Sequence, residues 1–422
     1  MKRRDFIHLS AATGAVIGLS ACGTNTSTAK TETALDQLEP ITGDVKPITV
    51  TEREGRIKKA QQLLQANNMQ ALLLDAGTGM TYFTGIRWGR SERTMVAIIP
   101  AKGEVFYICP GFEENRLREL IKIGKEVYAW QEDESPYQLI IDSLKKQGIE
   151  NGTLAMEESI RFFIMDGIRK LAPQFNFVSA DPVTIPCRLI KSPAELALMQ
   201  KATDVTIAAM KIGIQSLREG MTPKEFSEIV ATAQNKLGGS SDFAMVNFAE
   251  ASAFPHGSTK PQYLKKGDIV LMDCGCRVEG YSSDISRTIV FGAAPTERQQ
   301  QIWDLEKAAQ TAGYQAAQLG NTCEMVDAAA RKVITDAGFG PDYQLPGLPH
   351  RTGHGIGMDG HEWGNMVKGN QLKIQVGMCF SIEPNISIVG EFGVRHEDCV
   401  YMTEQGPKWF SQPAPSIDQA FV

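Results

Sequence analysis

The sequence predicts an α/β protein with two domains, of which the second is pseudo-symmetric. Helical and strand patterns alternate from about residue 46 to 183, and an order of helix, helix and strands then occurs twice between 184 and 422. A chain of 422 residues is long enough for two domains, each with its own core. A leader-like N-terminus precedes both.

The first 45 residues differ in composition from the rest of the chain. Lys2-Arg3-Arg4 precedes an apolar run to Ala21 that is too short to span a bilayer, as is typical of a signal peptide over 1–22. The paired arginines resemble a twin-arginine export signal, and Leu19–Cys22 resembles a lipobox, whose cysteine is lipidated. Residues 23–45 lack a hydrophobic period and predict a flexible tether.

We therefore expect export by the twin-arginine route to the periplasm or cell envelope, with a lipid on Cys22 as the only membrane contact. An uncleaved anchor is the alternative for the leader. The net charge of −6 gives no reason to expect nucleic acid as a partner.

The first domain opens with a predicted capping box at Thr51-x-x-Glu54 and a helix to about Gln65. Residues 71–74 then predict a buried strand, because all four are apolar. Residues 95–99 and 105–109 flank a turn around Gly103 and predict a hairpin.

In the second domain, each half begins with two predicted helices. Ser192-Pro193-x-Glu195 and Thr222-Pro223-x-Glu225 combine an N-cap, a proline at the first helical position and a capping-box glutamate. Strands follow over about 243–292. Thr296 with Gln299 opens the next helix, another covers about 322–337, and strands follow over about 350–403. The site is expected between the halves.

Seven cysteines remain after Cys22, and their spacing suggests no disulfide framework. Cys274 and Cys276 could form a soft-metal pair. We expect core residues instead, because Cys274 follows Asp273 on a predicted strand and points to the opposite face.

Asp273 and Asp284 lie in a segment that predicts strand, turn and strand, with the turn at Glu279-Gly280. A hairpin can place both carboxylates on one face. Two buried carboxylates raise each other's pKa, and a cation between them removes that cost. The apolar neighbours 270–272 argue against a solvated pair on an outer face.

Two further carboxylates lie near the C-terminus. Glu383 follows the apolar run 378–382. Around Glu397, a period of two puts Arg395 on the same face and His396 on the other. We therefore expect Arg395 as a cation in the pocket and His396 outside it.

His350, His354 and His361 lie in a glycine-rich segment. The first two have the spacing of a zincin helix, but the glutamate of that motif is absent and the glycines disfavour a helix. A phosphate loop is disfavoured because no Gly-Lys-Ser/Thr follows. The segment therefore predicts a loop.

Four carboxylates and three imidazoles now form one candidate set. It comprises His256, Asp273, Asp284, His354, His361, Glu383 and Glu397. This mixture of oxygen and nitrogen ligands suits a pair of hard divalent ions and predicts a two-metal hydrolase.

At these residues the chain resembles the metallopeptidase family of methionine aminopeptidase, prolidase and aminopeptidase P, which has the pita-bread fold. The catalytic resemblance spans about 185–405, beginning at Arg188-x-x-Lys191-Ser192-x-x-Glu195. Residues 80–85 resemble the creatinase/prolidase N-terminal domain. The resemblance implies a creatinase-like N-terminal α/β domain over 46–183 and a pseudo-symmetric pita-bread α+β catalytic domain over 184–422.

The resemblance also implies a role for each residue of the set. Asp273 would bind one metal ion, Asp284 and Glu397 would bind both, and His354 and Glu383 would complete the second. Glu383 would also shuttle the proton of a water shared by the ions, which leaves the attacking hydroxide. The remaining two histidines, His256 and His361, would polarise the scissile carbonyl. Mn²⁺ suits the mostly carboxylate shell, and Co²⁺ or Zn²⁺ would fit as well.

Two positions depart from the family pattern. Cys276 stands where a small residue is common, and Ser286 stands where threonine is usual. Neither is expected to touch the metal ligands.

The N-terminal domain favours a proline peptidase over methionine aminopeptidase. The implied activity is hydrolysis of the Xaa-Pro bond of dipeptides or short peptides. Arg395 and His350 would hold the carboxylate of a dipeptide. Trp88 would cap the pocket of a neighbouring subunit in a homodimer or dimer of dimers, or it is an ordinary core or surface aromatic.

Two alternatives remain open. A creatinase-like hydrolase would act on another small amide or C–N substrate, but such relatives need no metal and here every ligand is present. A non-catalytic binding lipoprotein would be marked by lost ligands, and none is lost.

Overall fold

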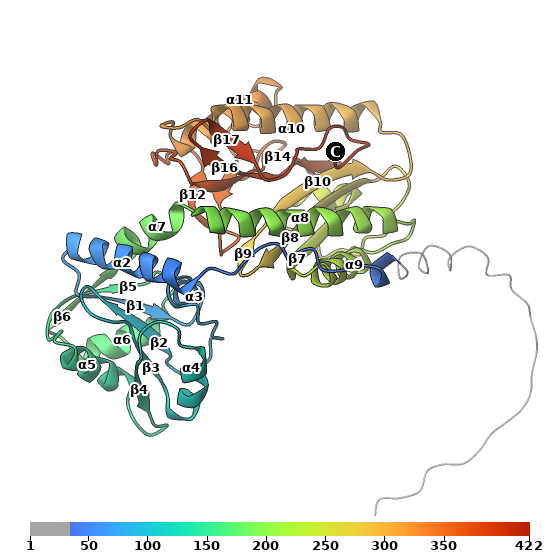
Figure 1. Cartoon of the computed structure of the whole chain (residues 1–422). Helices are drawn as coiled ribbons and strands as arrows, with labels where there is room; N and C mark the ends of the chain where they lie inside the picture. The colour runs from blue at the N-terminus through green and yellow to red at the C-terminus, as the bar shows by residue number, and fades with distance from the viewer. Residues whose placement is uncertain (1–33) are drawn as a thin grey trace, which may run out of the picture.

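The structure, a computed structural model, describes residues 34–422, which form two α/β domains joined along one helix (Figure 1). The α/β prediction is confirmed. The predicted signal peptide, Cys22 and the first part of the tether lie outside the described residues. No helix within 34–422 has the length and apolar character needed to cross a membrane.

The N-terminal domain is built on one six-stranded sheet of order β4-β3-β2-β1-β5-β6. Its strands are β1 (Ala71–Asp75), β2 (Val96–Pro100), β3 (Phe106–Pro110), β4 (Glu126–Trp130), β5 (Gly152–Met156) and β6 (Phe175–Ser179). Its helices are α2 (Val50–Ala66), α3 (Thr78–Thr84), α4 (Glu114–Leu120), α5 (Pro136–Lys146), α6 (Phe162–Leu171) and α7 (Asp181–Leu189).

The predicted strand at 71–74 and the β2–β3 hairpin both form. Successive side chains of β1 face opposite layers, as a strand period of two requires. Leu73 packs with α5 and α6, whereas Leu72 and Leu74 pack with α2. Helices therefore cover both faces of this sheet, which explains why β1 is apolar throughout.

The predicted capping box at Thr51 and Glu54 is wrong. Helix α2 begins two residues earlier than predicted. Its N-cap is Thr49, whose side-chain oxygen accepts a hydrogen bond from the amide of Glu52 at 3.1 Å. Thr49 and Thr51 are equivalent caps by residue type. The tertiary contact of the Glu52 carboxylate with Ser192 of the other domain favours the earlier start.

The catalytic domain repeats one arrangement. The first half contains α8 (Pro193–Ser216), α9 (Pro223–Lys236), β7 (Ser240–Phe248), β8 (Ile269–Val278), β9 (Tyr281–Ser282) and β10 (Ile285–Val290). The second contains α10 (Glu297–Ala316), α11 (Cys323–Asp336), β11 (Gly353–Gly355), β12 (Glu362–Met366), β13 (Cys379–Ile382), β14 (Asn385–Ile388), β15 (Phe392–Arg395), β16 (Asp398–Thr403) and β17 (Gly406–Trp409). The predicted capping boxes at Ser192, Thr222 and Thr296 all form.

The two halves meet at their sheets. The first half contributes β10-β8-β7, with β9 beside β8, and the second contributes β12-β11-β13-β16-β17 and the β14–β15 hairpin. Ser286, on β10, forms an antiparallel bridge with Glu397, which precedes β16. In Figure 1 the long helix α8 runs along the first half-sheet and α10 along the second. The site therefore lies where the two half-sheets join.

Two predicted boundaries need correction. Residues 34–45 are not a free tether: the amide of Ile41 donates to Leu237 O at 2.9 Å, and Asp44 pairs with Lys201 at 2.9 Å. Apolar contacts of Leu35 and Leu38 with the catalytic core hold this segment down. The boundary between 183 and 184 falls inside α7, so this helix is itself the junction between the domains.

Candidate metal centre

The β8–β10 hairpin places Asp273 and Asp284 together, as predicted. Ser286 of β10 pairs with Asp273 of β8, and Asp284 lies two residues before Ser286, directly ahead of the strand. Oxygens of both carboxylates lie within 4.8 Å of an oxygen of Glu397. Asp284 is buried and the side chain of Asp273 is only 16% exposed, so the two do not form a solvated pair on an outer face.

The second half supplies the remaining donors. Ser286 and Glu397 exchange backbone hydrogen bonds of 3.2 and 3.1 Å, which bring Glu397 to the first half. Glu383 follows β13, and its Oε1 lies 3.1 Å from Nε2 of His354. That nitrogen also lies 3.7 Å from Asp284 and 3.8 Å from Glu397. The segment is not helical, as predicted, but it is not a loop throughout, because His354 lies on strand β11.

His354 has the tautomer that a metal ligand needs. Its Nδ1 lies 3.1 Å from the carbonyl oxygen of Gly355, which can only accept. The proton of a neutral ring is therefore assigned to Nδ1, and Nε2 presents its lone pair to the three carboxylates.

Three of the carboxylates are destabilised in their charged form by their surroundings. Burial raises the pKa of Asp273, Asp284 and Glu397, and repulsion between neighbouring carboxylates adds to it at Asp284 and Glu397. Oδ1 of Asp273 and Oε1 of Glu397 are buried with no hydrogen-bond partner among residues 34–422. Hard divalent ions would satisfy these oxygens, so the donor set fits a dinuclear centre.

All seven residues of the candidate set line one cavity of about 670 Å³. The rings of His361 and His354 contact each other, with centroids 4.0 Å apart and planes tilted by 41°. Arg351 donates to Nδ1 of His361 at 3.1 Å, so a neutral ring carries its proton on Nε2. Burial, together with His354 and Arg351, lowers the pKa of His361 to about 4. At neutral pH, His361 is therefore an uncharged N–H donor.

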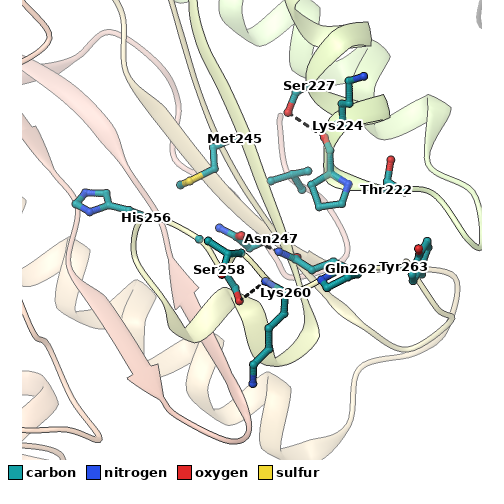
Figure 2. A pocket seen from close by; sticks show the side chains of 15 residues that line it. Thr222, Lys224, Ser227, Met245, Asn247, His256, Ser258, Lys260, Gln262 and Tyr263 are labelled. Carbon is teal, nitrogen blue, oxygen red and sulfur yellow. Dashed lines mark hydrogen bonds between the residues drawn. The ribbon is translucent and has the colours of Figure 1, made fainter.

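His256 enters the cavity from the loop between β7 and β8. Figure 2 shows its ring pointing away from a neighbouring pocket that its backbone helps to line. Gly257 has φ +85°, and a Cβ there would lie 2.9 Å from Oδ1 of Asn247. Gln262 donates to the same Oδ1 at 3.4 Å and accepts from the amide of Phe248 at 2.8 Å. These contacts hold the loop beside β7.

Arg395 and His350 also line the cavity. Arg395 donates to Asp273 through Nη2 and to Ser286 Oγ through Nε at 3.0 Å, which confirms a buried cation on the face of Glu397. Nδ1 of His350 donates to Arg351 O at 2.7 Å, so Nε2 of a neutral ring is an acceptor. Burial lowers the pKa of His350, which disfavours the protonated form that a carboxylate would require.

Trp88 is not brought to this cavity. It lines a different one of about 570 Å³ beside α3 and the β8–β9 turn, and the guanidinium of Arg116 lies 4.7 Å from its ring centroid. Within one chain, Trp88 is a half-buried surface aromatic.

The expectation that Ser286 avoids the ligands is wrong. Its hydroxyl donates to Oε2 of Glu397 at 2.8 Å. The hairpin pattern contained the signal, because a residue paired with Asp273 must share its face. Arg351 was also missed, and no local pattern marks it, since its contact with His361 depends on the path of the loop.

Other predictions near the site hold. Cys274 and Cys276 are buried core residues, and Cys276 contacts the backbone of Ala202 and not the carboxylates. His396 points away from the cavity, as the period of two requires. It is nevertheless fully buried, packed on Trp303 and 3.3 Å from Glu306.

Comparison with known proteins gives two family matches. Residues 197–404 match the model of metallopeptidase family M24, and residues 56–190 match the creatinase/prolidase N-terminal domain. An Xaa-Pro dipeptidase of Lactobacillus helveticus is 32% identical over 84% of this chain and 96% of its own length.

Solved structures give the same result. A prolidase from Thermococcus sibiricus has a TM-score of 0.79 and 28% identity, covering 88% of this chain and 98% of that one. A dipeptidase from Mycobacterium ulcerans has a TM-score of 0.80 and 30% identity, covering 89% and 100%.

Proposed function

The chain belongs to metallopeptidase family M24, and from this premise we propose that it hydrolyses the Xaa-Pro bond of dipeptides and short peptides. The observation that carries the proposal is the convergence of five donor side chains, from both halves of the catalytic domain, on one cavity. They are Asp273, Asp284, His354, Glu383 and Glu397. Relatives that cover almost the same length are named Xaa-Pro dipeptidase and prolidase.

These five residues would hold two divalent ions. Asp273 would serve one ion, His354 and Glu383 the other, and Asp284 and Glu397 lie between the two groups of donors. When bound, the ions would supply an acidified water and Lewis acids for the peptide carbonyl. We propose Mn²⁺, because the donor set is rich in carboxylates; Co²⁺ and Zn²⁺ are the competitors. Reconstituting chelator-treated protein with each ion, and measuring turnover, tests this choice.

Side chains of the protein would transfer the proton and stabilise the negative charge that develops on the carbonyl oxygen. Glu383 has the position of a proton carrier, because its carboxylate is at the cavity wall and is fixed by Ser381 at 3.2 Å. His361 can donate its Nε2 proton to the oxygen that becomes negative. His256 faces the same cavity from the opposite loop and would donate there as well.

The substrate carboxylate is assigned to Arg395. A guanidinium is charged at all working pH values, and one N–H on each Nη has no acceptor within the described part of the chain. His350 is the weaker of the two predicted contacts, since its neutral ring offers an acceptor at Nε2.

A substrate panel tests the activity directly. The purified protein with Mn²⁺ should release free proline from Ala-Pro and Gly-Pro. Comparison with Ala-Pro-Ala separates a dipeptidase from an aminopeptidase that accepts longer peptides. Absence of cleavage of every Xaa-Pro peptide by the metal-loaded protein would refute the proposal.

The same panel addresses the alternatives. A creatinase-like hydrolase would cleave a small C–N substrate such as creatine and leave Ala-Pro intact. A binding lipoprotein would bind peptides without turnover. The complete set of metal donors disfavours both.

We further propose that the protein is exported and carries a lipid on Cys22. The support is the sequence of the leader alone. Expression with Cys22→Ala should move the protein from the membrane fraction to the soluble fraction of the cell envelope. Replacement of Arg3-Arg4 by Lys-Lys should block its export, whereas an unchanged distribution would exclude the twin-arginine route.

A homodimer or dimer of dimers remains the proposed assembly, with Trp88 of one subunit at the pocket of the next. Its support is that Trp88 is half-exposed and away from the pocket of its own chain. Light scattering should give a multiple of the monomer mass. Trp88→Ala should raise KM without changing the bound metal.

A further inference from the structure

The turn that leads to His361 is folded around one buried carboxylate, that of Glu362. Its Oε1 accepts from the amides of Met358 at 3.0 Å and Asp359 at 3.2 Å. A Cβ at Gly357 would lie 2.7 Å from both carboxylate oxygens, so any larger residue there would displace the carboxylate. The carboxylate thus determines the path of the backbone between His354 and His361.

The same carboxylate is held by the junction between the domains. Nη2 of Arg188 donates to Oε1 at 2.6 Å, and Nζ of Lys191 donates to Oε2 at 2.9 Å. The side chains of Arg188 and Lys191 are only 4% and 2% exposed. Arg188 lies near the end of α7, and Lys191 in the short link to α8. These two residues belong to the segment whose resemblance marks the start of the catalytic domain, and the proposed chemistry gives them no other task.

The N-terminal domain contacts this turn directly. Oδ1 of Asp359 accepts from Thr78 of α3 at 2.6 Å, and its Oδ2 accepts from Arg188 at 2.7 Å. On the other side of the turn, the amide of Ser282 donates to Gly357 O at 2.8 Å. The turn is therefore fixed by the N-terminal domain, by the junction and by the strand next to Asp284.

We propose that Glu362, held by Arg188 and Lys191, is a positioning residue that sets the place of His361 in the cavity. The domain junction and the N-terminal domain thereby contribute to catalysis within one chain, through the turn and without touching substrate. The proposal rests on the donor role that the proposed function gives to His361.

A second buried ionic group offers a matched control. Glu195 lies 3.2 Å from Arg56 of the N-terminal domain and accepts from Tyr281 at 2.8 Å. It joins the same two domains and is equally buried, but none of its hydrogen bonds or ion pairs within residues 34–422 reaches the turn. If Glu362 only stabilised the fold, replacing Glu362 and replacing Glu195 would have the same effect on turnover.

Glu362→Gln is the primary variant, because it keeps the shape of the side chain and places an NH₂ group against either Arg188 or Lys191. Misplacing a reacting group by about 1 Å can reduce kcat on the order of 10²-fold. We expect a loss of that size for Ala-Pro, with KM and bound Mn²⁺ close to those of the wild type. Both variants should lower Tm, but Glu195→Gln should leave kcat unchanged. Equal losses of kcat in both variants would overturn the proposal.

A double-mutant cycle with His361→Ala distinguishes positioning from general damage. If Glu362 acts through His361, then Glu362→Gln should cause little further loss of kcat in the His361→Ala background. Multiplicative losses would overturn the proposal. If Glu362→Gln does not fold, Lys191→Met replaces it in the cycle, and Lys191→Arg should restore turnover. A wild-type protein inactive on all Xaa-Pro peptides would instead refute the proposed function.

Discussion

Asp273 and Arg395 share a hydrogen bond in which Nη2 of the arginine donates to Oδ2 of the aspartate. The other oxygen of Asp273, Oδ1, is buried with no partner among residues 34–422. The two oxygens therefore have separate uses: one faces a permanent cation and the other is available to a metal ion. Arg395 lies at once beside the metal centre and on the cavity wall, where a substrate carboxylate would arrive.

Arg395→Lys should weaken the binding of substrates with a free C-terminal carboxylate. A lysine cannot replace the contacts with Asp273, Ser286 and a substrate, because its three N–H groups share one nitrogen and cannot reach the separate positions that Nε and the two Nη atoms of arginine occupy. Loss of a charge-assisted hydrogen bond costs about 1.5–3 kcal/mol, so KM for Ala-Pro should rise roughly 10- to 100-fold. Ala-Pro amide should be affected much less. Equal effects on both substrates would contradict the assignment of the carboxylate to Arg395.

Glu383→Gln should abolish most of the turnover. The amide cannot carry a proton, and general acid–base groups contribute on the order of 10²–10⁴-fold in rate. The measurement is kcat at saturating metal, with metal content determined in the same sample. Glu391→Gln, on an exposed surface carboxylate, is the control for the loss of one charge. Wild-type kcat in Glu383→Gln would exclude this residue as the proton carrier.

Metal binding should release protons and weaken as pH falls. Burial raises the pKa of Asp284 and Glu397 well above their usual range, so the metal-free site retains protons that a cation must displace. Calorimetry of Mn²⁺ binding in buffers of different ionisation enthalpy measures this release. Binding enthalpies that do not depend on the buffer would show that the site is already ionised.

Ser286→Ala should lower the metal affinity and leave the fold intact. The hydroxyl donates to Glu397 and accepts from Arg395, so it would orient a proposed metal ligand without itself binding the ion. Loss of such an orienting contact typically costs about 10- to 100-fold in affinity. Ser286→Thr retains the hydroxyl and is the matched control. Equal affinity in the alanine variant and the wild type would refute this role.

The ion pairs of Glu362 should stabilise the fold in a pH window that their pKa defines. Burial alone would raise the pKa of this carboxyl, but Lys191 and Arg188 outweigh it and hold the pKa at about 2, against 4.5 in the unfolded chain. The unfolded state therefore binds the proton first as pH falls. The stabilisation, roughly 3 kcal/mol, is complete above about pH 4.5 and is lost as pH approaches 2.

Urea unfolding of wild type and Glu362→Gln across this range measures the effect. The difference in free energy of unfolding should be largest at neutral pH and should shrink below about pH 4.5. The carboxylates of the metal centre titrate in both proteins, so their contribution cancels in the comparison. A difference that stays constant down to pH 3 would contradict the pairing.

Local sequence patterns were sufficient to predict those features that depend only on residues close together in the chain. The capping boxes at Ser192, Thr222 and Thr296 form, because the N-cap and its partner lie within one helical turn. The hairpin period put Asp273 and Asp284 on one face. The choice between Thr49 and Thr51 as the cap of α2 was not local, because the contact between Glu52 and Ser192 joins residues of different domains.

The order of residues alone determined the α/β class and the repeated halves, since these depend on residue type and on periods of two or 3.6. It also supplied the seven candidate site residues, among which the family resemblance selects the five proposed metal donors. Only the tertiary structure decided which groups surround those donors. Ser286 reaches Glu397, Arg351 reaches His361, and Arg188 with Lys191 reaches Glu362. These contacts depend on how two halves and two domains meet, and the free energy that selects them comes from burial across the whole chain and not from any one segment.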